Sequence, residues 1–89
     1  MNQGSKLYVG NFPYSTTENS LAELFEDYGD VQSVRIVVDD NEVSKGYGFV
    51  EMRTPAAAEN AMRKLQDTMF NGRRLRVGYA TPKGVNGKK

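Results

Sequence analysis

The sequence predicts an α+β fold in which two helices pack on one face of a four-stranded antiparallel sheet. Strand and helix patterns follow one another as strand, helix, strand, strand, helix, strand, and the two helical segments carry apolar residues at the same spacing. A chain of 89 residues is the size of one small domain. Two helices on one sheet face would close a modest core and leave the other face in solvent.

The first half of the chain is predicted to form strand, helix and strand. Residues 6–10 form a short strand, and Pro13 breaks regular structure in the turn that follows. Thr17 can cap a helix over 18–28, because its hydroxyl can accept a hydrogen bond from an amide of the first turn. Residues 33–38 alternate as a second strand. The apolar stripe of the helix consists of Leu21, Leu24, Phe25 and Tyr28.

The second half repeats this plan. Residues 45–52 form the third strand, and Pro55 lies near the start of a second helix, where its missing N–H is not needed. Asn71 and Gly72 predict a tight turn, and residues 74–79 form the last strand. The apolar positions of the second helix are Ala58, Ala61, Met62 and Leu65.

These elements place one domain at residues 6–80. Residues 1–5 are polar and contain Gly, so we expect a flexible N-terminal end. Residues 81–89 are polar and basic, with Pro82 and two Gly, so we expect a flexible tail.

The residue types that are missing exclude several classes of site. The chain has no Cys and no His, so it lacks a disulfide, a thiolate nucleophile, a cysteine zinc site, the usual general base and the commonest metal ligand. Asp39 and Asp40 are adjacent, but no further acidic ligand follows at a recognised spacing, so we expect no metal. We predict a protein that is not an enzyme and needs no cofactor.

Hydropathy bounds the partners and the location. No apolar run approaches the roughly 20 residues that a membrane span needs, and no signal-peptide pattern opens the sequence. We therefore expect no membrane partner and an intracellular location, either the cytoplasm, including a bacterial one, or the nucleus. We also expect a monomer.

Strand alternation places an unusual set of side chains on the open face. Successive strand residues point to opposite faces, and the core takes Leu7 and Val9 of the first strand. The outward positions then hold three aromatic residues on two strands, Tyr8, Tyr47 and Phe49. Four basic residues are expected around them: Lys6, Arg35, Lys45 and Arg76.

An exposed aromatic cluster needs an explanation, whereas a single exposed apolar residue does not. Unpaired nucleobases stack on flat aromatic faces, and Lys and Arg hold the phosphates. Gly46 and Gly48 beside the cluster are typical of places where another group approaches the backbone closely. Two interpretations stay open: a surface for nucleic acid, or a surface covered by a terminal helix, a partner protein or a second copy.

At these residues the sequence resembles a known family, the RNA-recognition motif. Its longer ribonucleoprotein octamer is closely matched by residues 45–52, KGYGFVEM, and its shorter hexamer resembles residues 7–12, LYVGNF. The resemblance covers residues 6–80 and implies a ferredoxin-like βαββαβ sandwich. Met52 stands where the octamer has an aromatic residue, and Phe12 where the hexamer more usually has Leu. Both are apolar replacements, and neither removes a stacking residue.

The resemblance implies a protein that binds single-stranded RNA, with single-stranded DNA as an open alternative. Tyr8 and Tyr47 would each stack a base, and Phe49 would pack on bases or insert between riboses. Lys45 would meet a phosphate, and the segment after the last strand, with Lys83, would tune the choice of sequence. The candidate RNA-binding residues are Tyr8, Tyr47, Phe49, Lys45, Lys6, Arg35, Arg76, Asn11 and Lys83.

Two questions stay open within this resemblance. Asn11 ends the first strand beside the open face, and it can be a turn residue or a ligand contact. A protein-interaction module of the same fold, using its helical face or the aromatic residues of the sheet, is the alternative function. Relatives that bind peptides on the helical face typically carry an Arg-x-Phe signature before the last strand. Residues 69–75 lack that signature, which favours nucleic acid.

The net charge of +1 conceals an uneven distribution. Residues 1–67 hold six basic and eleven acidic side chains, a net charge of −5, whereas residues 68–89 hold six basic and no acidic ones, a net charge of +6. The acidic residues fall mostly in the first helix and in turns. We therefore expect the positive charge to gather on the open face and toward the C-terminus.

Overall fold

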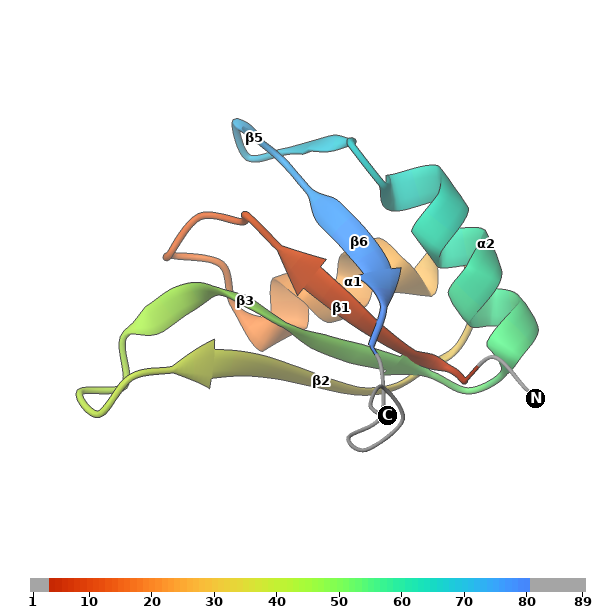
Figure 1. The fold of residues 1–89 in the computed structure, drawn as a ribbon, viewed down its shortest axis with the longest axis horizontal. Helices are drawn as coiled ribbons and strands as arrows, with labels where there is room; N and C mark the ends of the chain where they lie inside the picture. The colour runs from red at the N-terminus through yellow and green to blue at the C-terminus, as the bar shows by residue number, and fades with distance from the viewer. Residues whose placement is uncertain (1–3, 81–89) are drawn as a thin grey trace, which may run out of the picture.

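The chain folds as a four-stranded sheet with two helices packed on one face, as Figure 1 shows for the computed structural model. The structure describes residues 4–80, so the predicted tail at 81–89, with Lys83, and the first residues of the predicted N-terminal end lie outside the described residues. The elements are β1 (Lys6–Gly10), α1 (Glu18–Glu26), β2 (Val31–Val38), β3 (Ser44–Met52), α2 (Pro55–Leu65), β4 (Met69–Phe70), β5 (Arg73–Arg74) and β6 (Arg76–Tyr79).

The strand order β2-β3-β1-β6 places the two motif-bearing strands, β1 and β3, side by side at the centre of the sheet. Every neighbouring pair is antiparallel, so the predicted α+β arrangement is confirmed. The small β4–β5 pair forms a separate hairpin before β6. The first and third predicted strands therefore present their outward side chains on adjacent rows of one surface.

The core lies between the sheet and the helices. Met52 and Phe12, the two departures from the family pattern, are both buried there, so these apolar replacements serve packing. Alternating residues of β1 and β3 point to the same layer, as their period of two requires. The buried apolar residues are Leu7, Val9, Phe12, Leu21, Phe25, Val50, Met52, Ala58, Ala61, Leu65, Leu75 and Val77.

Both helices begin at a capping threonine. The Oγ1 atom of Thr17 accepts a hydrogen bond from the Ser20 amide at 3.1 Å, and Ser20 Oγ accepts one from the Thr17 amide at 3.1 Å. Thr54 caps α2 in the same way, directly before Pro55. The first helix ends at Glu26, two residues before the predicted end. The amides of Tyr28 and Gly29 donate to carbonyl oxygens three residues back, a tighter pattern than that of an α-helix.

The predicted last strand at 74–79 is wrong in its first residues. Asn71 and Gly72 have positive φ values of 52° and 89°, which matches a hairpin turn whose twist suits the flanking strands. That turn folds Arg74 back against Met69 in the β4–β5 hairpin. The strand that joins the main sheet therefore begins only at Arg76.

Side chains occupy backbone donors on both edges of the main sheet. On β2, the Ile36 amide donates to Glu18 Oε2 at 3.0 Å. On β6, the Val77 amide donates to Gln66 Oε1 at 2.7 Å. Exposed strand edges invite pairing with other chains, so these two contacts reduce the number of free donors that the edges offer.

Candidate nucleic-acid interface

Three aromatic rings form a continuous surface on the face that the helices leave uncovered. The register pairs Tyr8 with Phe49, and it sets Gly10 opposite Tyr47. The ring centre of Tyr8 lies 6.0 Å from that of Tyr47 and 6.1 Å from that of Phe49, both within the range of aromatic contact. Tyr8 is 37% exposed, and the other two are partly exposed. We call Tyr8, Tyr47 and Phe49 the sheet aromatics; the predicted outward positions of all three are confirmed.

Gly10 sets how Tyr8 lies. A Cβ atom on Gly10 would overlap the hydroxyl end of Tyr8 and would lie 2.8 Å from its Cζ atom. The tyrosine ring therefore covers the glycine, which is buried although it belongs to the open face. The missing side chain at this position lets the Tyr8 ring lie along β1 toward Tyr47.

Contacts within the protein itself explain why glycine stands at positions 46 and 48. A Cβ on Gly48 would overlap the Arg35 carbonyl oxygen of β2 and approach the Ile36 Cα atom to 2.9 Å. Gly46 has a φ of +85°, and a Cβ there would lie 3.2 Å from the ring of Tyr14. The group that approaches each backbone closely is therefore the chain's own, and these glycines give no separate indication of a ligand.

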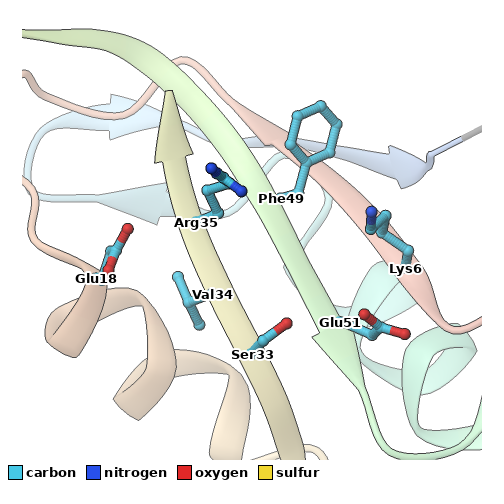
Figure 2. A pocket seen from close by; sticks show the side chains of 7 residues that line it. All are labelled: Lys6, Glu18, Ser33, Val34, Arg35, Phe49 and Glu51. Atoms are coloured by element: carbon cyan, nitrogen blue, oxygen red, sulfur yellow. The ribbon is translucent and has the colours of Figure 1, made fainter. Parts of the chain in front are cut away.

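One hollow lies on the β2 side of the sheet aromatics, and we call it the β2-side hollow. Figure 2 shows Arg35, Phe49 and Lys6 on three neighbouring strands. Lys6 Nζ lies 5.9 Å from the Phe49 ring centre, within cation–π distance. This hollow of about 400 Å³ contains two basic and two acidic side chains, and its lining is Lys6, Glu18, Ser33, Val34, Arg35, Phe49 and Glu51.

A second hollow lies at the opposite end of the sheet aromatics, where β1 ends. It measures about 560 Å³, and its lining includes three basic residues and no acidic one. We call it the tyrosine hollow, because three tyrosines line it. Its lining residues are Tyr8, Asn11, Phe12, Tyr14, Lys45, Gly46, Tyr47, Arg73 and Arg76.

The Asn11 amide joins the end of β1 to the β4–β5 hairpin. Its Nδ2 donates to the Arg74 carbonyl oxygen at 2.7 Å, and its Oδ1 accepts from Nη2 of Arg73 at 2.9 Å. Its φ of +67° is a conformation that Asn tolerates better than most residues. Asn11 thus has a structural function, and it places the Arg73 guanidinium beside the open face.

The structure brings the predicted cations to two places and adds two residues that the sequence analysis did not select. Lys6 and Arg35 lie in the β2-side hollow, and Lys45 and Arg76 lie in the tyrosine hollow. Tyr14 and Arg73 are the additions. Tyr14 follows the Pro13 turn, where alternation no longer assigns a face, and Arg73 reaches the face only through the hairpin. The Asn-Gly turn was the sequence signal that could have indicated the position of Arg73.

Several known proteins are similar to this chain in sequence. Residues 7–76 match the RNA recognition motif family. The chain is 43% identical over 81 residues to RNA-binding protein CP31B, chloroplastic, of Arabidopsis thaliana, a match that covers 90% of this chain and 28% of that relative. It is also 44% identical over 75 residues to the human cleavage stimulation factor subunit 2 tau variant, covering 83% of this chain and 12% of that one. The chain therefore spans less than a third of the length of either relative.

Solved structures agree in fold. The crystal structure of RNA binding protein PG1 superposes with a TM-score of 0.85 at 38% identity, covering 90% of this chain and 98% of that one. A structure described as the Rna15 RRM with bound RNA (GU) superposes with a TM-score of 0.81 at 29% identity, covering 94% and 90%. By its matched residues, its sheet order and its paired motifs on β1 and β3, this chain belongs to the RNA recognition motif family.

Proposed function

We propose that this domain binds single-stranded RNA on the open face of its sheet, with unpaired bases lying on the sheet aromatics. The observation that carries the proposal is the row of three rings, with neighbouring centres about 6 Å apart, on a face that neither helix covers within residues 4–80. Stacking of one base on such a ring contributes roughly 1–3 kcal/mol. Family membership and relatives that carry the name RNA-binding protein support the same ligand.

In this proposal Tyr8 and Tyr47 each stack a base, and Phe49 packs on bases or inserts between riboses. Lys45 takes a phosphate at one end of the row, where Arg76 lies in the same hollow, and Lys6 and Arg35 take the backbone on the other side. The one salt bridge among the described residues joins Arg53 to Asp30 at 3.9 Å, so these four cations are free to meet phosphates.

In this proposal a single chain binds RNA, and it carries out no catalytic step. RNA differs from DNA of the same sequence by the 2′-hydroxyl, which a protein can contact directly. Within the described part of the chain, no helix is long and apolar enough to cross a membrane.

A titration of the purified domain with a fluorescein-labelled pool of random RNA, followed by anisotropy, tests the proposal. The double variant Tyr47→Ala/Phe49→Ala should bind at least about 30-fold more weakly, since it loses two stacks of about 1 kcal/mol or more each. Tyr79→Ala is the matched control, because Tyr79 is also 37% exposed but lies on the helix side of β6 by alternation with Val77. A folded double variant that binds as tightly as the wild type would refute the proposal, and tighter binding to the DNA pool would replace RNA by DNA.

A further inference from the structure

We propose that the tyrosine hollow holds one further nucleotide of the bound strand, with its base on Tyr14 and its phosphate among Lys45, Arg73 and Arg76. The inference rests on the proposed function, because this nucleotide belongs to the strand whose other bases lie on the sheet aromatics. It extends the interface beyond the sheet, onto the loop after β1 and the β4–β5 hairpin.

Tyr14 is an aromatic ring that is both exposed and supported. It is 72% exposed, more than any other large hydrophobic side chain among the described residues. Its ring edge nevertheless lies against Gly46, where a Cβ would come within 3.2 Å of the ring. The loop is held there as well, since the Phe12 amide donates to the Gly46 carbonyl oxygen at 3.3 Å. A ring supported on one side and open to solvent on the other can stack a base.

Arg73 is the cation that the fold places most specifically. Its guanidinium donates to Asn11 Oδ1 at 2.9 Å, and Asn11 is itself tied to the hairpin backbone through the Arg74 carbonyl oxygen at 2.7 Å. A guanidinium has five donor hydrogens, so the Asn11 contact leaves donors free for phosphate oxygens, which arginine binds in paired geometry. Asn11 is neutral, so this contact orients the arginine without cancelling its charge.

The hollow is continuous with the sheet aromatics. Tyr8 and Tyr47 line it as well as the open face, so a strand stacked on these rings passes into the hollow without leaving the protein surface. Its volume of about 560 Å³ falls within the size range of ligand sites in proteins. Three cations without a carboxylate in the lining suit an anionic backbone rather than a neutral ligand.

Two random RNA pools of different length separate this nucleotide from those on the sheet. One pool has about four nucleotides and covers the sheet aromatics, and the other has about eight and can also enter the hollow. Tyr14→Ala should weaken binding of the long pool about fivefold and that of the short pool by less, because it removes one stacked base. Tyr14→Phe, which keeps the ring, should restore the affinity, and Tyr79→Ala again serves as the control for a lost aromatic side chain.

The salt dependence tests the phosphate contact independently. Arg73→Gln should make the slope of log affinity against log salt about 0.7 less steep on the long pool, the value expected for one phosphate contact on a single strand. Arg63→Gln is the matched control, because Arg63 is an exposed arginine of α2, in the layer behind the sheet. That control should leave the slope as in the wild type.

The outcomes distinguish failure of the inference from failure of the proposed function. If Tyr14→Ala and Arg73→Gln bind the long pool as the wild type does, while Tyr47→Ala/Phe49→Ala loses binding, the hollow is empty and the sheet interface stands. Equal losses on both pools show a structural effect on the sheet and also overturn the inference. If the wild type binds neither pool, the proposed function itself fails.

Discussion

The two ends of the open face differ in charge although they share the same row of aromatic rings. In the β2-side hollow, Lys6 and Arg35 lie beside two carboxylates. In the tyrosine hollow, Lys45, Arg73 and Arg76 meet no carboxylate in the lining. A polyanion is therefore attracted unequally along the face, and the stronger attraction lies where β1 ends. The overall charge of +1 hides a local field that gives a bound strand a preferred anchoring end.

The largest expected effect comes from disturbing the packing of β2 against β3, the two strands that carry Arg35 and Phe49 of the β2-side hollow. In Gly48→Ala the new Cβ overlaps the Arg35 carbonyl oxygen, which is backbone and cannot rotate away. We expect the free energy of unfolding to fall by about 1–3 kcal/mol, the usual cost of overpacking, as measured by urea denaturation. Gly78→Ala on β6 serves as the control, because a Cβ there meets no atom within 4 Å and the residue does not have a positive φ. Full stability of Gly48→Ala would contradict the close approach of β2 to β3.

Charge reversal at each end tests the asymmetry directly. Arg76→Glu should weaken RNA binding about tenfold or more, because a hydrogen bond to a charged group contributes about 1.5–3 kcal/mol and the new carboxylate repels phosphate. Arg35→Glu should cost less, since the field at that end already contains two carboxylates. Anisotropy titrations at one salt concentration measure both, and equal losses would remove the proposed difference between the ends.

Gly10→Ala alters the ring of Tyr8, which lines the tyrosine hollow and lies about 6 Å, centre to centre, from both other sheet aromatics. The added methyl displaces the hydroxyl end of Tyr8, a movable side-chain terminus, so the fold should survive while the stacking surface tilts. We expect about fivefold weaker RNA binding, equivalent to one poorly placed stack. An unchanged affinity, measured with a thermal unfolding midpoint like that of the wild type, would show that the tilt of Tyr8 is unimportant.

Neutralising the carboxylate of Glu51 should raise the RNA affinity slightly, in contrast to the losses expected above. Glu51→Gln removes a negative charge from the β2-side hollow and keeps the size of the side chain. RNA affinity should rise about twofold, because exposed charge interactions contribute a few tenths of a kcal/mol to about 1 kcal/mol, and the gain should disappear at high salt. A loss of affinity would mean that Glu51 contacts the strand favourably.

The smallest expected effect concerns the loop that joins β2 and β3. Hydrogen bonds from the Val43 and Asn41 amides, with a smaller contribution from the charge of Lys45, hold the pKa of Asp39 below its ordinary 3.8. Since the folded state favours the carboxylate, its stabilisation is present above pH 3.8 and is lost as the pH falls through the lowered pKa. Amide shifts of Asn41 and Val43 in an NMR titration should change with a midpoint below 3.8. A midpoint at or above that value would contradict these bonds.

The sequence was sufficient wherever a local period decides which side a residue faces. The period of two in β1 and β3 predicted the outward Tyr8, Tyr47 and Phe49 and the buried Met52, because neighbours in a strand must alternate. The threonine caps and the Asn-Gly turn were equally local signals. These elements were enough to predict the sheet, both helices and the aromatic row.

What the sequence could not supply depends on contacts between distant segments. Tyr14 joins the site because its loop packs on Gly46, and Arg73 joins because Asn11 bonds to it from 62 positions away in the chain. Arg74 does not belong to the last strand, contrary to the prediction, because a turn with two positive φ values pairs it with Met69. Gly48 predicts that another group approaches the backbone closely, and the structure shows that this group is the backbone of β2. None of these contacts produces a periodic pattern of residues in the sequence.

The most direct test of base stacking on the sheet is an NMR titration of the aromatic ring protons with the random RNA pool. A base stacked on a ring shifts the protons of that ring upfield. The account predicts large shifts for the rings of Tyr8, Tyr47 and Phe49 and small ones for Phe25 in the core and for Tyr79. Shifts confined to residues of α1 and α2, with the three sheet rings unmoved at saturation, would contradict it.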